Sequence, residues 1–167
     1  MSDQSFTTTF SVDRTPREVF DAVVDVRGWW SEDIDGGTAE AGDEFEYRNG
    51  DVHTCKVRIT EVVPDRRVSW LVLENHFDFT ADQTEWAGTT VDFDIAEVDG
   101  RTELRFTHGG LVPVHECYDV CSTAWGFYVG DSLRELVTTG AGQPNAAGRT
   151  TLGAGASAGQ PAAQEVP

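Results

Sequence analysis

The chain has 167 residues and carries 29 acidic against 12 basic side chains, which gives a formal net charge of −17. Such a surface repels phosphate groups, so we do not expect nucleic-acid binding. No stretch approaches the roughly 20 apolar residues that cross a bilayer, and the first residues lack the basic and apolar parts of a secretion signal, so we expect a cytoplasmic protein without a membrane span.

The first predicted elements are a strand and a helix. Apolar and polar residues alternate over 6–12, which is the period of a half-buried strand. The sequence Thr-Pro-Arg-Glu at 15–18 places a hydroxyl at a helix N-cap, proline at the first helical position and glutamate at the third, which is a capping box. Apolar residues at helical spacing give this helix an inner face, and we expect it to end near Gly28.

A run of antiparallel strands follows the helix. In the second of them, the apolar residues at 57 and 59 mark the buried face, so His53 and Cys55 are expected to point inward. In the last strand, His108 alternates in phase with apolar residues and is expected to point inward as well. The alternating segments predict strands at 45–47, 53–59, 68–73, 91–95 and 104–108.

The alternating pattern breaks between Glu74 and Trp86, where a polar connection links two strands. Connections of this length are often functional or mobile. Two interpretations stay open: the segment is a lid over a site, or it is an irregular loop whose Phe77, Phe79 and Trp86 cover the core.

A long helix predicted at 114–137 closes the folded part of the chain. Its inner stripe carries Tyr118, Cys121 and Trp125, and Gly140 supplies a C-cap. The apolar face of one curved antiparallel sheet must be covered by another element, and this is the only predicted helix that is long enough to cover it. A single helix laid across a curved sheet leaves space between the layers, which is a candidate ligand cavity.

The composition changes after the closing helix. The last residues are mainly Ala, Gly, Pro, Gln and Ser, with almost no large apolar side chains, so they cannot offset the entropy of ordering. We therefore expect one domain at 1–140 and a disordered tail at 141–167.

Six stretches carry a family resemblance: Thr15-Pro-Arg-Glu-Val-Phe-Asp-Ala, Gly28-Trp-Trp-Ser, Gly42-Asp-Glu-Phe, Ile59-Thr-Glu-Val-Val-Pro, Val68-Ser-Trp and Thr102-Glu-Leu-Arg-Phe-Thr-His-Gly-Gly-Leu. With them the chain, over about residues 5–138, resembles the SRPBCC or helix-grip superfamily of START domains, the pollen allergen Bet v 1 and bacterial polyketide cyclases. Within that superfamily it looks most like the Activator of Hsp90 ATPase homologue 1-like branch. The resemblance implies an α+β fold in which a curved antiparallel sheet wraps around a long C-terminal helix.

The resemblance also implies a cavity that takes lipids, steroids, polyketides or other largely apolar molecules. The leading hypothesis is therefore a carrier or sensor of a hydrophobic small molecule, without a cofactor. Indole and imidazole groups suit a pocket that is apolar but needs an occasional hydrogen-bonding group. The candidate ligand-binding residues are Trp30, His53, Cys55, Trp70, Trp86, His108, Tyr118, Cys121 and Trp125.

A metal or thiol site is one alternative. A His-x-Cys pair on a strand face and a Cys-x-x-x-Cys pair on the helix would together form the tetrahedral set that zinc prefers. Against this, buried cysteine commonly serves as a small apolar filler, so no metal is assigned. The side chains of this alternative are His53, Cys55, His108, His115, Cys117 and Cys121.

An acid–base enzyme of the polyketide cyclase type is a further alternative. His53 or His108 would serve as the base, and Glu85, Glu116 or Tyr118 as the acid. Such chemistry needs two of these groups at one point, and the sequence assigns no catalytic residue. Eukaryotic relatives stimulate a chaperone ATPase, but no feature of this chain supports a chaperone partner, while pairing with a second copy stays open.

Overall fold

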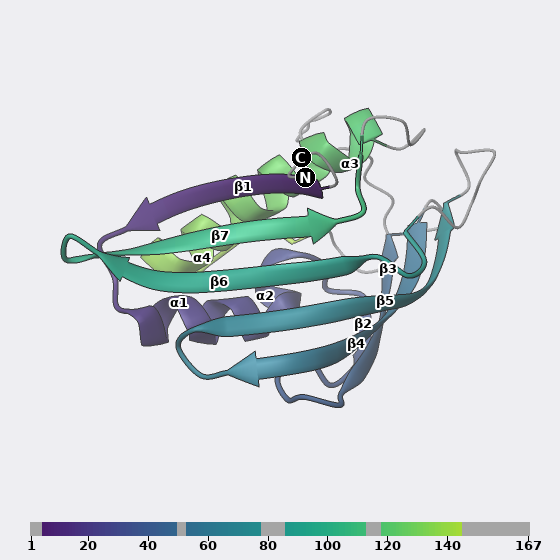
Figure 1. Cartoon of the computed structure of the whole chain (residues 1–167), viewed down its shortest axis with the longest axis horizontal. Helices are drawn as coiled ribbons and strands as arrows, with labels where there is room; N and C mark the ends of the chain where they lie inside the picture. Colours follow the sequence, from purple (N-terminus) through teal and green to yellow (C-terminus); the bar gives the residue numbers. More distant parts are fainter. Residues whose placement is uncertain (1–4, 50–52, 78–85, 113–117, 145–167) are drawn as a thin grey trace.

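Seven strands form one curved antiparallel sheet, in the order β1-β7-β6-β5-β4-β3-β2 (Figure 1). The computed structural model describes residues 5–49, 53–77, 86–112 and 118–144. The strands are β1 (Ser5–Val12), β2 (Ile34–Gly36), β3 (Glu44–Asn49), β4 (His53–Val63), β5 (Arg67–Phe77), β6 (Thr90–Val98) and β7 (Arg101–Gly109).

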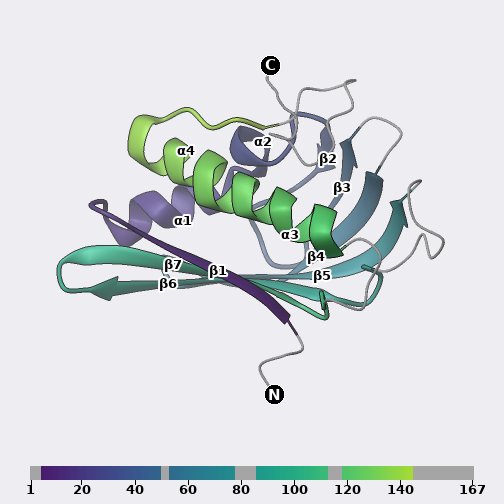
Figure 2. The ribbon, with the colours of Figure 1, turned by 90° about the horizontal axis from the view of Figure 1, so that it is seen from above.

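The helices lie on the concave side of the sheet, which curls around them (Figure 2). The closing helix is continuous and consists of α3 (Tyr118–Phe127), the π-helix η2 (Tyr128–Leu133) and α4 (Arg134–Thr139). Two short helices, α1 (Pro16–Val24) and α2 (Val26–Trp29), pack beside it. This arrangement confirms the predicted α+β, helix-grip architecture.

Local sequence signals explain how the helices begin and end. The predicted capping box is present at α1, where Thr15 Oγ1 accepts from Glu18 N at 3.1 Å and Glu18 Oε1 accepts from Thr15 N at 2.9 Å. The helix expected to reach Gly28 is instead two helices, because the backbone at Asp25 leaves the helical region. Gly140 ends α4 in the left-handed conformation, with φ 89°. None of the described helices is both long and apolar enough to cross a membrane.

Two bulges interrupt the pairing of β4 with β5. Lys56 pairs with Glu74 but Val57 pairs with Val72, so Leu73 is an extra residue in β5. One extra residue reverses the alternation of faces, which is why β5 extends to Phe77 although its sequence pattern breaks at Glu74. The strand predicted at 68–73 therefore continues to Phe77, into the segment whose sequence pattern predicts a loop or a lid.

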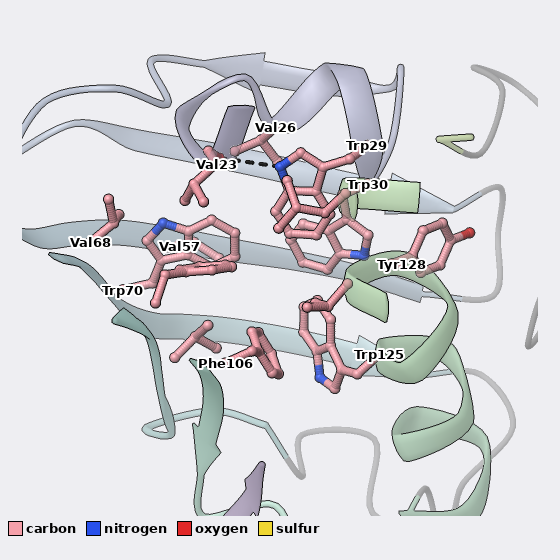
Figure 3. Close-up of a cluster of buried hydrophobic side chains, with 14 of the residues drawn as sticks. Val23, Val26, Trp29, Trp30, Val57, Val68, Trp70, Phe106, Trp125 and Tyr128 are labelled. Carbon is pink, nitrogen blue, oxygen red and sulfur yellow. Dashed lines mark hydrogen bonds between the residues drawn. The ribbon is translucent and has the colours of Figure 1, made fainter. Parts of the chain in front are cut away.

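The core lies between the sheet and the helices and is rich in aromatic rings (Figure 3). Trp29, Trp70 and Trp125 are among the largest fully buried side chains. The closing helix contributes Cys121 and Trp125 from α3, and Tyr128, Val129, Ser132 and Leu133 from η2. The π-helix therefore buries four of its six residues at the middle of the closing helix.

The first residues of the predicted tail contact the folded part. Gln143 N donates to Ser132 Oγ at 2.6 Å, and the Gln143 amide nitrogen donates to Glu135 Oε1 at 2.7 Å. Ser132 is itself buried and donates to the carbonyl oxygen of Trp29 at 2.8 Å. These bonds tie the chain just after α4 to η2 and α2, and residues 145–167 of the predicted tail lie outside the described residues.

Candidate functional site

Five aromatic side chains form a closed circuit of ring contacts beneath α3, and we name this set the aromatic–histidine cluster. Neighbouring ring centroids in the circuit are 3.9 to 5.5 Å apart. Tyr47 and His53 come from the adjacent strands β3 and β4, and Trp125 comes from α3. In the order of their contacts, the members are Trp30, Tyr47, His53, Trp86 and Trp125.

His53 is a buried, neutral member of this cluster. Its Nε2 lies 2.7 Å from Asn75 Oδ1, so the ring carries its proton on Nε2 and donates to the amide oxygen. Burial lowers the pKa of His53 to about 3, and the hydrogen bond to Asn75 opposes this only in part. Because the imidazole resists protonation at neutral pH, His53 is poorly suited to act as a general base or acid.

His108 has a partner on each ring nitrogen. Trp125 Nε1 donates to its Nδ1 at 3.0 Å. Its Nε2 lies 2.8 Å from Thr89 Oγ1, and that hydroxyl donates to the carbonyl oxygen of Trp86 at 2.6 Å. The hydroxyl proton is thereby committed, so His108 Nε2 is the donor and the imidazole is the neutral Nε2–H tautomer. No lone pair is left on this ring to accept a proton or to bind a metal.

The two described cysteines are buried next to the cluster. Burial raises the pKa of the Cys55 thiol, which therefore stays protonated and is a weak nucleophile. Burial also raises the pKa of Tyr47 well above its usual value, and Tyr128, Cys55 and Cys121 contribute to this effect. The phenol and both thiols are therefore close enough to interact electrostatically, as neutral polar groups among aromatic rings.

Two indole N–H groups lack an acceptor among the described residues. Trp86 Nε1 and Trp70 Nε1 are buried and make no hydrogen bond. Trp86 belongs to the aromatic–histidine cluster, with the polar side chains of His53 and His108 at centroid distances of 4.6 and 4.8 Å. A buried donor without a partner costs about 1–3 kcal/mol, so the Trp86 N–H carries an uncompensated desolvation cost within the cluster.

Trp70 lies in a different environment, which we name the inner aromatic stack and define as Trp29, Phe45, Trp70 and Phe93. The Trp70 centroid is 5.3 Å from that of Phe45 and 4.9 Å from that of Phe93. In Figure 3 the Trp70 nitrogen lies on the side of Val68, away from Trp125. Trp30 joins the two regions, at 5.6 Å from Trp70 and 5.0 Å from Trp125.

The space between these tryptophans is occupied by the rings themselves. Trp30 stacks on Tyr47 at 3.9 Å, and Trp86 stacks on Trp125 at 5.5 Å. These are contact distances between aromatic rings. A molecule larger than water therefore enters the cluster only when a ring moves.

A groove of about 270 Å³ lies where β3, β4 and β5 run side by side. Most of its lining side chains are charged or polar, and the cations are paired: Lys56 Nζ is 3.7 Å from Glu44 Oε1, and Arg48 contacts Asp33 and Glu46. This groove is too polar to suit the expected apolar ligand. Its lining consists of Glu46, Tyr47, Arg48, Thr54, Cys55, Lys56, Glu74, Asn75 and His76.

The structure brings most of the sequence-predicted residues together. Trp30, His53, Trp86, His108 and Trp125 form one contact network, and Trp70 adjoins it through Trp30. The predictions that His53, Cys55 and His108 point inward are confirmed by their burial. Tyr118 is half-buried at the start of α3 and packs against the core, and Cys121 is buried one turn later.

Metal binding receives no support from the described residues. Within them, no group of three or more His, Cys, Asp or Glu side chains is placed to hold a metal ion. His115 and Cys117, which the metal alternative also invoked, lie outside the described residues, as do Phe79, Glu85 and Glu116 from the lid and enzyme alternatives.

Sequence reasoning missed Asn75 and Thr89 as parts of the site, and it placed Phe77 in a loop rather than in a strand. Asn75 and Phe77 point inward only because the bulge at Leu73 changes the phase of β5. A search for alternation that allowed one inserted residue would have found both. Thr89 has no comparable signal, since its role depends on the distant His108.

Comparisons with known proteins agree with this architecture. Residues 13–138 match the family model described as Activator of Hsp90 ATPase homolog 1-like protein. Comparison with curated proteins gives no significant match. The chain is similar in structure to the Aha1 dimer from Colwellia psychrerythraea, with a TM-score of 0.65, 20% identity, and coverage of 81% of this chain and 97% of that one.

Two further solved structures share the fold. DynU16, described as a protein in the dynemicin biosynthetic locus, gives a TM-score of 0.62 at 18% identity over 84% of this chain, which spans only 49% of DynU16. CalU16 from Micromonospora echinospora gives 0.58 at 16% identity, over 81% of this chain and 76% of CalU16. At these identities the likeness concerns the fold alone.

Proposed function

Because the chain belongs to the Activator of Hsp90 ATPase homolog 1-like family, whose helix-grip fold commonly encloses an apolar ligand, we propose that it binds a hydrophobic small molecule as a carrier or sensor. The proposed site is the aromatic–histidine cluster beneath α3. Trp86, His53 and Trp125 are its central residues. Trp70, which is also a candidate from the sequence, lies outside it in the inner aromatic stack and adjoins it through Trp30.

The observation that carries this proposal is the buried Trp86 N–H without an acceptor among the described residues. The protein would avoid the cost of this donor by placing a phenylalanine there, or by providing a carbonyl oxygen as it does for Trp29, whose Nε1 donates to Val23 O at 3.2 Å. A ligand with an acceptor oxygen supplies the missing partner.

The surroundings of Trp86 define the chemistry of the ligand. The rings of Phe77, His53 and Trp125 lie within 4.6 to 5.5 Å of the Trp86 ring, so the body of the ligand is apolar and flat enough to stack. The net charge of −17 disfavours anions near the protein. The preferred ligand is therefore a neutral aromatic or polycyclic molecule with a carbonyl or ether oxygen.

Binding at this site requires a ring to move. His53 and Trp86 are each less than a tenth exposed, and their rings are in contact. A ligand therefore replaces ring–ring contacts by ring–ligand contacts and adds one hydrogen bond. Because the rings are in contact without a ligand, we expect binding by induced fit, in which a ring moves as the ligand enters.

Acid–base catalysis is less well supported than binding. The low pKa of His53 and the two occupied nitrogens of His108 leave neither imidazole prepared to transfer a proton at neutral pH. Neither His53 nor His108 is prepared for proton transfer, which is expected of a binding site rather than a catalytic one.

A matched pair of ligands tests the proposal. 2-Acetylnaphthalene and 2-ethylnaphthalene have nearly the same apolar body, but only the first has an acceptor oxygen. Calorimetric titration of both compounds should show saturable binding that favours the ketone. Trp86→Phe, which keeps a ring and removes the N–H, should weaken binding of the ketone by about five- to tenfold, the value of one hydrogen bond, and leave the hydrocarbon nearly unchanged.

Trp70→Phe is the control, since it also removes an unpartnered N–H but in the inner aromatic stack. It should leave the binding of both compounds unchanged. If neither compound nor a wider panel of neutral polycyclic ketones binds in a saturable way, the carrier or sensor role is wrong. If the two variants affect the ketone equally, the site is misplaced.

A further inference from the structure

The strand β1 lies at one edge of the sheet and itself lacks the charges, prolines and bulges that usually prevent edge-to-edge pairing; only near its end does a charged side chain, Arg101, donate to the carbonyl oxygen of Ser11 at 3.2 Å. It pairs with β7 over eight consecutive residues without a bulge, and no described strand covers its other side. Its sequence from Ser5 to Val12 contains no charged residue and no proline, although a quarter of the chain is charged. Natural proteins usually protect long edges with charges, prolines or bulges.

The opposite edge of the sheet is built differently. Strand β2 has only three residues, Ile34–Gly36, and its middle residue is the exposed Asp35. Short length and a charge are common protections against pairing with another chain. The contrast makes β1 the edge that is suited to accept a further strand.

The first seven residues of β1 also read the same in both directions. From Ser5 to Ser11 it is Ser-Phe-Thr-Thr-Thr-Phe-Ser, with Thr8 at the centre. When two copies of such a strand run antiparallel about a twofold axis at Thr8, each residue meets a residue of its own type. Twofold symmetry is the commonest arrangement of homo-oligomers, and it requires this kind of self-complementary surface.

We propose that two copies of the chain form a symmetric dimer by antiparallel pairing of their β1 strands, centred on Thr8, so that the two sheets become one continuous sheet. In this register Phe6 faces Phe10 of the second copy, and Thr7 faces Thr9 of the second copy. Alternate backbone groups of β1 are directed away from β7, and these provide the new hydrogen bonds.

The side chains on both faces of β1 fit this register. Phe6 and Phe10 are half-buried on the concave side, so pairing covers the part of each ring that the monomer leaves exposed. Thr7 and Thr9 are exposed on the other side. Aromatic pairs and threonine pairs are both favourable when they face each other across antiparallel strands.

The twofold axis keeps the two α3 helices at opposite ends of the paired strands. In Figure 1, α3 extends past β1 near the N-terminal end of that strand, whereas α4 lies behind β7 nearer the other end; Figure 2 shows the helix on the concave side. The twofold axis at Thr8 brings the α3 end of one copy next to the opposite end of β1 in the other. The two α3 helices therefore lie apart.

Charge and size make the dimer weak. Each copy carries −17, so the copies repel each other at low ionic strength, and salt screens this repulsion. One strand pair is also smaller than the roughly 1,200 Å² that stable interfaces usually bury. The dimer should therefore form at high protein concentration and should tighten severalfold as sodium chloride is added.

Sedimentation velocity of the full chain over about a hundredfold range of concentration tests the pairing, because a weak interface shows itself only in the upper part of such a range. Two double variants then test the register. Thr7→Lys with Thr9→Lys places two lysines opposite each other twice, and should abolish the dimer even though it lowers the overall negative charge. Thr7→Lys with Thr9→Glu places a lysine opposite a glutamate twice, and should restore dimerisation to at least the level of the unchanged chain.

Thermal unfolding of dilute samples controls for effects within one copy, since Thr9 also pairs with Arg105 of β7. Both variants should remain folded, because positions 7 and 9 are exposed. A chain that stays monomeric at every concentration and salt level overturns the proposal. So does equal behaviour of the two variants, whether both are dimeric or both are monomeric, because only the register centred on Thr8 distinguishes them.

Discussion

The inner aromatic stack and the aromatic–histidine cluster are built from the same kinds of rings, but they differ in their polar groups. In the inner stack, Trp29 donates its N–H to Val23 O, and its own carbonyl oxygen accepts from Ser132. In the cluster, His53 is neutral through burial and the Trp86 N–H has no acceptor among the described residues. Aromatic content alone therefore does not distinguish the proposed binding site from the inner stack.

The two regions of the interior therefore differ in what their polar groups can do. In the inner stack the Trp29 N–H is satisfied within the protein, whereas in the cluster the unpartnered Trp86 N–H lies among other polar side chains and retains a desolvation cost. Trp70 limits this contrast, because its N–H is also unpartnered. Its neighbours Phe45, Trp29 and Phe93 are apolar, however, so they offer a ligand no second polar contact.

Truncation to alanine should give the largest difference between the two regions. Trp29→Ala should lower the free energy of unfolding by about 3–5 kcal/mol, because it opens a cavity at a fully buried position of the core. It also removes the hydrogen bond to Val23. Trp86→Ala should cost about 1 kcal/mol less, since it removes an unpartnered donor as well. Urea unfolding followed by far-ultraviolet circular dichroism measures both, and equal losses would contradict the contrast.

Acid should act mainly on the cluster. The pKa of His53 is lowered from 6.5 to about 3, so the unfolded chain binds a proton that the folded chain refuses as the pH falls below 6.5. Stability from this residue is complete above that value and is lost on acidification, by about 2 kcal/mol between pH 7 and pH 5.

The variant His53→Gln isolates this contribution, because glutamine is polar and does not titrate. Its unfolding free energy should change between pH 7 and pH 5 by about 2 kcal/mol less than that of the unchanged chain. The carboxylates are common to both proteins, so their effects cancel in the difference. Identical pH profiles would show that His53 is not held neutral.

The hydrogen-bond chain through Thr89 predicts a smaller effect. Thr89→Val keeps the shape of the side chain but leaves the His108 Nε2–H and the Trp86 carbonyl without their shared hydroxyl. The expected cost is about 1–3 kcal/mol. Thr89→Ser keeps the hydroxyl and is the matched control, which should retain most of the stability. Chemical denaturation of the two variants separates the contribution of the hydroxyl from that of the methyl group. A valine variant as stable as the serine variant would argue against the hydrogen bonds made through Thr89.

Local signals in the sequence were sufficient for much of the fold. The capping box at 15–18 and the C-cap at Gly140 involve only neighbouring residues, and both are confirmed. Strand alternation was sufficient to predict that His53 and His108 are buried. These features were accessible because each depends on residues within one turn or one strand.

The remaining features depend on contacts between distant segments. The bulge at Leu73 is defined by pairing with β4, and it made a strand resemble a loop. The π-helix η2 depends on packing of the closing helix against the sheet rather than on a local motif. The partners that fix the two imidazoles, Asn75 and Thr89, are 22 and 19 residues away from them. The alternation of apolar and polar residues predicted the face of the sheet on which each histidine lies, but it could not predict the hydrogen-bond partner.

The most delicate test replaces each tryptophan by phenylalanine, which keeps an aromatic ring and removes only the N–H and part of the ring area. Trp29→Phe loses the bond to Val23 and leaves that carbonyl without its indole donor, whereas Trp86→Phe removes a donor that has no partner. Since the loss of ring area is the same in kind, the first variant should be less stable than the second by about 0.5–1.5 kcal/mol, the net value of one hydrogen bond. Paired urea titrations resolve a difference of this size when both variants have the same slope with denaturant. A Trp86→Phe variant that is the less stable of the two would mean that its N–H is satisfied in solution, and the cluster would then be a second structural core rather than a binding site.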